Sequence, residues 1–454
     1  MSNEFLRDAY LEQVSQAVDE VYPADKNKPS IYRDTTSFFI NDAKNTREQL
    51  DLKIKIAQVQ DELADARQHD EVLEKRLMGL IASLDDSKQK DATDRHNRLN
   101  RVRKVCQTLY QLCEGKNPTE TQQKTAKFLA ALWLISENHQ GDYRTLHQRL
   151  KAPYKVAITL RFIDDVLRNQ LAQVPNWESF TDPDMRYKNE QNQQRWFAAV
   201  AMPIMMAALF QDAGLQHPLA LRLLNGARGE LDPFRVLNQE ERPSLLKMNY
   251  RFSVDYVTLG LGVDYATNYA SPEEQILAHA TTLEVVKDAY KPMQGIGELI
   301  KIPQIYASVV FSTKQHFVRE DVPKDCMLVD QLGKKGVLQP ALAKSFSGIT
   351  GLFPQGFGVL NQDYKGMVYG LNPNSAHEPH CLPLLDHNDA LVNQPEHVLA
   401  KAENFYFTST RKQFSVVEKA KIDVLVKPNN TPPDTNFWQP SQYFTRWQPT
   451  WAAL

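Results

Sequence analysis

The stretch RWFAAVAMPIMMAALFQDAGLQHP, residues 195–218, decides the fold class of this chain. Its first part, up to Phe210, is almost continuously apolar, and a run of this length is typical of a buried helix, because strands are usually four to eight residues long. Gln211 and Asp212 follow, and Ala213-Gly214 then break the helix. A carboxylate where a buried helix ends is a position at which a metal site could be built, so Asp212 is the first candidate site residue.

Composition limits the classes of protein to consider. The 454 residues are 42% hydrophobic and carry a formal net charge of −2, which suits two or three domains and gives no reason to expect binding to nucleic acid. The N-terminus is charged and polar, and no apolar run approaches the roughly 18 residues of a membrane-spanning helix. The four cysteines fit neither a disulfide framework nor a zinc pattern. We therefore expect a cytoplasmic protein without a membrane span.

Three regions are expected: an N-terminal helical region over 1–118, a helical domain over 119–353, and a small β element with a tail over 354–454. The first region has few Gly or Pro residues between 43 and 114 and repeats leucines every three or four positions. Both an antiparallel helical hairpin and a dimerising coiled coil fit this pattern. The polar stretch DDSKQKDATDRHN, 85–97, is the expected turn or solvated segment between the helices.

The second region reads as nearly continuous helix, beginning after the helix-start signal at Asn117-Pro118. After Pro354 the sequence pattern changes to short apolar segments between Gly, Asn and Pro residues, which is typical of strands. The segments ENFYFTST, 403–410, and KIDVLVK, 421–427, are further strand candidates. The Pro- and aromatic-rich end is expected to pack as an irregular tail, with an exposed partner-binding peptide as the alternative.

The helical block resembles a known family. AALFQDAG (207–214), GELDPFRVLNQEERP (229–243) and LQPALAKSFSGITGLFPQGFGVL (338–360) resemble, in this order, motifs of the bacterial HD-GYP domain. This domain is the cyclic di-GMP phosphodiesterase branch of the HD superfamily. The resemblance covers about half of the chain. It implies an HD-like helical bundle followed by a small strand pair, so the expected fold is mainly α with a small C-terminal β element.

The same resemblance implies that the chemistry has been lost. The family binds two or three iron or manganese ions through His and Asp ligands, and these ions activate the attacking water. Here Gln211 stands at the position of the family's histidine, while Asp212 remains. Arg242 replaces the His before Pro, Leu215 replaces a phosphate-contacting Lys, and Gln304 lies where the late helix should carry acids. An upstream ligand position falls on Ala152.

The candidate site residues follow from this comparison. Gln211, Asp212, Arg242 and Gln304 are interpreted as relic positions of a metal site, with no metal and no cofactor expected. The structural interpretation of Asp212 is a helix-end acceptor bonded to backbone N–H groups or to an arginine such as Arg222 or Arg242. Possible contacts to a ligand are His217, Lys301 and Lys314.

The leading functional hypothesis is a catalytically inactive HD-GYP-like bacterial signalling or scaffold protein. It would bind a protein partner or hold a cyclic dinucleotide without hydrolysing it. One alternative is an active metal-dependent phosphohydrolase, with iron or manganese held by Asp212, His217 and His279. The other is a structural adaptor that forms a homodimer through its N-terminal helices.

Overall fold

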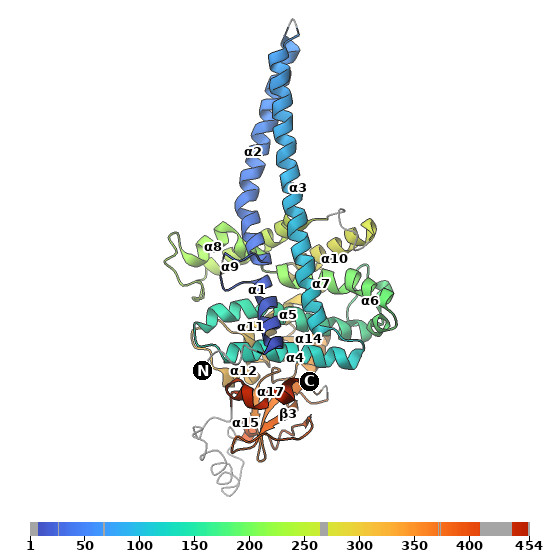
Figure 1. Cartoon of the computed structure of the whole chain (residues 1–454), viewed down its shortest axis with the longest axis vertical. Coiled ribbons are helices and arrows are strands. Elements are labelled where there is room, and N and C mark those ends of the chain that lie inside the picture. The colour runs from blue at the N-terminus through green and yellow to red at the C-terminus, as the bar shows by residue number, and fades with distance from the viewer. Residues whose placement is uncertain are drawn as a thin grey trace.

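A computed structural model of the chain describes residues 8–25, 27–66, 69–263, 271–370, 372, 374–408 and 438–452. The described chain is mainly helical, with one small antiparallel sheet near the C-terminal end, as the sequence predicted. A long helical hairpin projects from one end of the helical body, and the sheet lies at the opposite end (Figure 1). No helix within the described residues combines the length and the apolarity that crossing a bilayer requires.

The projecting hairpin consists of α2 (Ile31–Asp65) and α3 (Glu71–Cys113), which follow the short helix α1 (Ala9–Val21). The side chains of Ser30 and Asp70 accept hydrogen bonds from backbone N–H groups of the first turns of α2 and α3, which fixes where each helix begins. The hairpin predicted from the leucine repeats is therefore confirmed.

Of the two interpretations of 85–97, the turn is wrong and the solvated segment is right, because most of these residues are exposed. The chain reverses between Asp65 and Glu71, whereas the polar stretch 85–97 lies inside α3. This stretch has no Gly or Pro and is built from residues that tolerate a helix, so polarity alone does not interrupt it. Within it, Asp91 accepts hydrogen bonds from the side-chain amides of Asn45 and Gln49 on α2.

The body is built around two buried helices, α5 (Tyr143–Arg168) and α7 (Met202–Phe210). Every residue of α7 is buried, which explains its continuous apolar sequence. Asn117 is the N-cap of α4, where the sequence predicted a helix start. Its side chain accepts a hydrogen bond from the backbone N–H of Glu120 at 2.9 Å. The other helices of the body are α4 (Pro118–Glu137), α6 (Glu190–Trp196), α8 (Pro218–Asn225), α9 (Glu241–Asp255), α10 (Pro272–Tyr290), α11 (Glu298–Val310), α12 (Val322–Asp325), α13 (Leu328–Lys334) and α14 (Pro340–Thr350).

The sheet contains four antiparallel strands in the order β1-β2-β3-β4, all within the region where strands were expected. They are β1 (Gly358–Leu360), β2 (Lys365–Gly370), β3 (His380–Leu385) and β4 (His397–Val398). The strand predicted over 403–410 is wrong: its described part forms the short helix α15 (Phe405–Thr408). Its aromatic residues pack against Phe353 and Phe357. The strand predicted over 421–427 lies outside the described residues.

The C-terminal segment is packed against the body and is helical rather than irregular. It forms the 3-10 turn Pro440–Tyr443 and α17 (Phe444–Ala452). Trp438, Trp447 and Trp451 are all buried. The Trp438 indole donates to the Gly366 carbonyl of β2 at 2.6 Å, and the Trp451 ring packs edge-on against Tyr10 of α1. The segment thus ties the sheet to the first helix of the chain.

One hydrophobic cluster contains residues from the hairpin base, the helical body, the sheet and the C-terminal segment, including Leu109, Phe210, Met367 and Trp447. Residues from all three expected regions therefore contribute to one core.

Candidate functional site

The end of α7 is held tightly against α9. A β-carbon at Gly214 would lie 2.3 Å from the backbone oxygen of Asn249, so only glycine permits this close approach. Ser253 accepts the Gly214 backbone N–H and is also within 2.9 Å of the Gln211 carbonyl oxygen. These contacts fix Gln211 and Asp212, which follow α7 directly, in one orientation.

The carboxylate of Asp212 has three polar neighbours, each from a different helix. The Asn249 amide of α9 donates to its Oδ1 at 3.0 Å, and the Tyr290 hydroxyl of α10 lies 3.4 Å from the same atom. The Lys155 Nζ of α5 is 3.8 Å from Oδ2. Asp212 is therefore a meeting point of helices that are far apart in the sequence.

Lys155 is the unexpected member of this group. Its side chain is 3% exposed, and its Nζ also donates to the Gln211 Oε1 at 3.4 Å. Burial lowers the Lys155 pKa, while the neighbouring Asp212 carboxylate acts in the opposite direction. Lys155 explains why residue 211 is a glutamine. The Gln211 amide oxygen accepts a hydrogen bond from the Lys155 ammonium, whereas a positively charged side chain at this position would be repelled by it.

A second lysine lies near the same carboxylate. Lys151 is one turn before Lys155 on α5, so the two side chains share a face of the helix. The Lys151 pKa is lowered to about 8, mainly by burial; the Asp212 carboxylate opposes this shift and the charge of Lys155 adds to it. Two lysines near one carboxylate leave an excess of positive charge, which is an arrangement suited to an anion.

The other predicted site residues lie in different surroundings. Arg242 is exposed at the start of α9, so Lys155, and neither Arg222 nor Arg242, is the cation that the structure brings to Asp212. Gln304 and Lys301 lie half-buried on α11. Lys314 is exposed after α11, where its carbonyl accepts the Tyr143 hydroxyl at 2.5 Å.

His217 has a structural position. Its Nδ1 accepts the Leu219 backbone N–H at 3.1 Å at the start of α8, and its ring stacks on Phe252 with 3.5 Å between centroids. Burial lowers the His217 pKa. His279 is not beside His217; it lines a small cavity together with Met202 and Met206. Within the described ranges, no three His, Cys, Asp or Glu side chains are gathered in a way that could hold a metal ion.

Sequence reasoning missed the two lysines, although the sequence contained a signal for them. Lys151 and Lys155 interrupt KAPYKVAITLRF, a stretch that is otherwise apolar enough to be buried. Lysine is rarely buried without a partner, so two lysines one turn apart in a buried helix predict a nearby acceptor. The sequence does not identify this acceptor, because Asp212 lies 57 positions after Lys155 along the chain.

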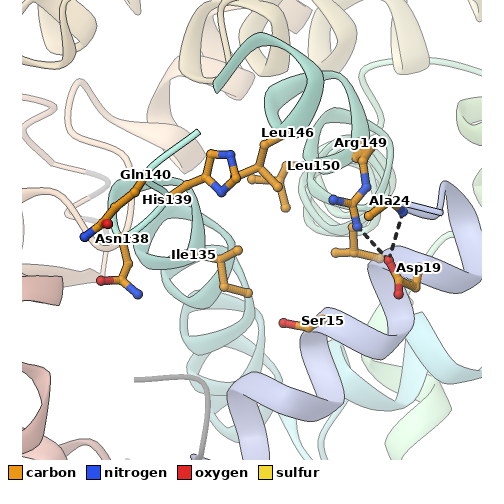
Figure 2. Close-up of a pocket in the computed structure, with 11 residues that line it drawn as sticks. Ser15, Asp19, Ala24, Ile135, Asn138, His139, Gln140, Leu146, Arg149 and Leu150 are labelled. Carbon is orange, nitrogen blue, oxygen red and sulfur yellow. Dashed lines mark hydrogen bonds and ion pairs between the residues drawn. The ribbon is translucent and has the colours of Figure 1, made fainter. Parts of the chain in front are cut away.

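A cleft with a cavity of about 360 Å³ lies between α1, α4 and α5 (Figure 2). Val18, Ile135, Leu146 and Leu150 give it apolar walls, and Ser15, Asp19, Asn138, His139, Gln140 and Arg149 surround them. Arg149 donates to Asp19 at 2.6 Å and to the Tyr22 carbonyl at 2.9 Å. The cleft therefore presents an already paired ion pair, side-chain amides and an imidazole whose pKa is lowered by burial.

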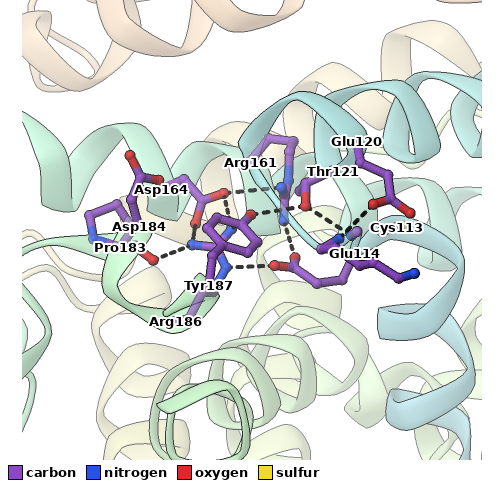
Figure 3. Close-up of polar contacts among 12 residues, drawn as sticks. Cys113, Glu114, Glu120, Thr121, Arg161, Asp164, Pro183, Asp184, Arg186 and Tyr187 are labelled. Carbon is purple, nitrogen blue, oxygen red and sulfur yellow. Dashed lines mark hydrogen bonds and ion pairs between the residues drawn. The ribbon is translucent and has the colours of Figure 1, made fainter. Parts of the chain in front are cut away.

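A buried ionic network joins α3, α4 and α5 to the 3-10 turn Pro183–Tyr187 (Figure 3). Arg186 donates to Glu114 at 2.6 Å and, with two nitrogens, to both oxygens of Asp164 at 2.9 Å. Arg161 contacts the same two carboxylates at 3.1 Å. Two guanidinium groups thus balance two carboxylates, which is the composition of a structural cluster and leaves no excess charge for a ligand.

Ser136 and His147 form a further buried pair. The Nδ1 of His147 donates to the Ser312 carbonyl at 2.7 Å, because a carbonyl can only accept, so its Nε2 accepts the Ser136 hydroxyl at 2.6 Å. Burial lowers the His147 pKa to about 3. Both side chains are fully buried, so no substrate reaches the hydroxyl, and the pair links α4, α5 and the segment after α11.

Comparisons with protein-family models, with curated proteins and with solved structures found no match to this chain.

Proposed function

We propose that this chain is a non-catalytic scaffold, an HD-GYP-like protein of the bacterial cytoplasm whose function is binding. The observation that carries the proposal is the position of Lys155. Its ammonium faces Gln211 and Asp212, the two residues that the resemblance assigns to a metal site. On this proposal, a positive charge fixed to the chain takes the place of the family's metal ions.

The chemical consequence concerns water activation. A divalent metal lowers the pKa of its bound water and so supplies a nucleophile near neutral pH. An ammonium carries a single charge and has no coordination position for a water ligand. It also repels a divalent cation that approaches Asp212. The same residue that neutralises the carboxylate therefore disfavours the reaction of the family.

The long hairpin supports the scaffold interpretation. Helices α2 and α3 extend well beyond the helical body (Figure 1), with 35 and 43 residues. Leu50 on α2 and Met78 on α3 remain largely exposed, at 55% and 68%. A projecting element with exposed apolar side chains is suited to contact another protein.

The direct test measures metal content and turnover together. We expect the full chain, purified without chelator and incubated with Mn²⁺ or Fe²⁺, to bind less than a stoichiometric amount of metal and to leave cyclic di-GMP intact. The Asp212→Asn variant should behave identically, because it removes no working ligand. Stoichiometric metal that depends on Asp212, accompanied by hydrolysis, would overturn the proposal.

Lys151 and Lys155 favour a second candidate function, which is retention of an anionic cyclic dinucleotide without hydrolysis. Lys155 is 3% exposed and already faces Asp212, so the half-buried Lys151, one turn earlier on α5, is the cation that would meet a phosphate group. Calorimetric titration of the full chain with cyclic di-GMP should then give saturable binding that weakens about tenfold or more in Lys151→Gln. Lys287→Gln, on α10, is the matched control. Absence of heat at high micromolar ligand would remove this candidate and leave the scaffold proposal standing.

A further inference from the structure

The hairpin carries two apolar stripes, and the structure uses one of them. The first stripe forms the seam between α2 and α3 and repeats with alternating steps of three and four residues. On α2 it runs through Leu52, Ile56, Val59 and Leu63, and on α3 through Leu73, Leu77, Leu80 and Leu84. The polar residues Gln49 and Ser87 occupy the next seam positions of the same pattern. Val59 and Leu84 are buried in this seam, while the other seam residues are half-buried.

The second stripe has no partner in the hairpin itself. Leu50, Ile54 and Ala57 are exposed on α2, and Met78 and Ile81 are exposed on α3. With the seam residues at the a and d positions of a heptad, four of these five residues fall at b and e positions, and Ile54 falls at the outer f position. In an antiparallel pair the e positions of both helices border the same flank, so these residues form one face.

The contacts along the seam show which residues of this face lie at the same level. The Gln49 amide is 3.2 Å from the Ser87 hydroxyl, and Arg76 is 3.5 Å from Glu62. Moving along both helices from these contacts places Ala57 opposite Ile81. The smallest side chain of the second stripe therefore lies beside its centre, where a close approach of another backbone is possible.

We propose that a second copy of this chain docks on this face, with a two-fold axis that crosses α2 at the level of Ala57 and α3 at the level of Ile81. The inference rests on the proposed scaffold function and names the partner of its hairpin. Along each helix, a residue on one side of the axis then faces the residue at the same distance on the other side of the axis in the second copy. On α2 this places Lys53 opposite Asp61 of the second copy, and on α3 it places Glu74 opposite Lys88 of the second copy.

Both pairings join opposite charges, which supports this occupant over an unrelated partner. A two-fold contact is self-complementary, so every pair occurs twice and a single favourable pair contributes two contacts. The apolar side chains would then form the centre of a four-helix bundle, with charges at its border, as in stable interfaces. Each copy would supply Leu50, Ile54, Met78 and Ile81 to this centre.

The first experiment uses cross-linking. A residue on a two-fold axis meets its own copy, so Ala57→Cys should form an intermolecular disulfide under mild oxidation. The four native cysteines are buried and give little background. Gln58→Cys is the matched control, because the next position along α2 is also exposed but lies on the opposite flank. Equal cross-linking of both variants, or of neither, would overturn the proposal.

The second experiment measures the oligomeric state of the full chain by sedimentation velocity. We expect a dimer for the wild type and an association weakened about tenfold or more in Met78→Glu. Val72→Glu, an exposed apolar position of α3 outside the face, should remain dimeric. Glu74→Lys should weaken the dimer, and Lys88→Glu in the same chain should restore it. Circular dichroism verifies that each variant is folded.

A monomer at about 100 µM wild-type chain would contradict this inference. Such a result would leave the non-catalytic scaffold proposal intact, because metal binding and hydrolysis are measured separately on the same protein. Metal-dependent hydrolysis by a dimer would contradict the non-catalytic proposal and leave the dimer inference intact.

Discussion

The Lys155 ammonium of α5 lies 3.8 Å from the Asp212 carboxylate at the end of α7. The two partners differ in exposure, since the Lys155 side chain is 3% exposed and the Asp212 side chain 25%. Asp212 also retains the Asn249 amide as a donor at 3.0 Å. Loss of one partner therefore affects the other unequally, and this asymmetry can be measured.

Replacing Asp212 should cost more stability than replacing Lys155. Asp212→Ala leaves a buried ammonium without a carboxylate, for which we expect a loss of about 3 kcal/mol in the free energy of unfolding. Lys155→Met leaves a carboxylate that still has solvent and Asn249, so we expect about 1 kcal/mol or less. Urea denaturation of both variants measures the difference.

The double variant Lys155→Met with Asp212→Ala supplies the control. It should be more stable than Asp212→Ala alone, because the unpaired charge is gone. A double variant whose losses simply add would mean that the two residues do not interact.

The ionic network around Arg186 should be the most sensitive charged cluster of the fold. Arg186→Leu leaves Glu114 and Asp164 with Arg161 as their shared cation, in a place where the Glu114 side chain is 2% exposed. We expect a loss of about 3–5 kcal/mol by chemical denaturation. Arg168→Leu breaks an exposed pair with Asp184 and should cost less than about 1 kcal/mol. Similar losses for both variants would show that burial of the network does not matter.

Docking of the C-terminal segment should depend on pH through Glu137. Its Oε2 accepts the Ser441 backbone N–H at 2.9 Å, and burial raises the Glu137 pKa from 4.5 to about 7. The folded chain then binds this proton more tightly than the unfolded chain. Stability from this group is present below about pH 4.5 and is lost as the pH rises through about 7, by at most about 3 kcal/mol.

Glu137→Gln keeps an acceptor for Ser441 and removes the titration. Thermal unfolding of this variant between pH 5 and 8 should therefore show a smaller loss of stability with rising pH than the wild type. An unchanged pH profile would mean that Glu137 titrates at its ordinary value.

The C-terminal aromatic residues should act as part of the core. Trp447 is fully buried, and its indole donates to the Pro440 carbonyl at 2.9 Å. Trp447→Ala should cost about 3–5 kcal/mol in unfolding free energy, because it leaves a large cavity and an unpaired carbonyl. Thr445→Ala, at an exposed position of the same helix, should change stability by about 0.5 kcal/mol or less. A tolerated Trp447→Ala would show that the segment folds independently of the body.

The sequence predicted features that depend on local patterns. The apolar run before Phe210, the leucine repeats of the hairpin and the cap at Asn117 each express the preference of a short segment. The strands between Gly358 and Leu385 were also recognisable from their turn residues. The turn placed in 85–97 and the strand placed at 403–410 failed because neither polarity nor aromatic content alone determines local structure.

What the sequence by itself determined is the helical class of the chain, its hairpin and its small sheet, because periodicity and capping act over a few neighbouring residues. The tertiary structure alone decided that Lys155 faces Asp212, that Arg186 joins Glu114 to Asp164, and that Trp451 packs against Tyr10. These pairs are far apart along the chain. Their proximity follows from how the helices pack, and a buried charge or ring accepts whichever complementary partner that packing brings to it.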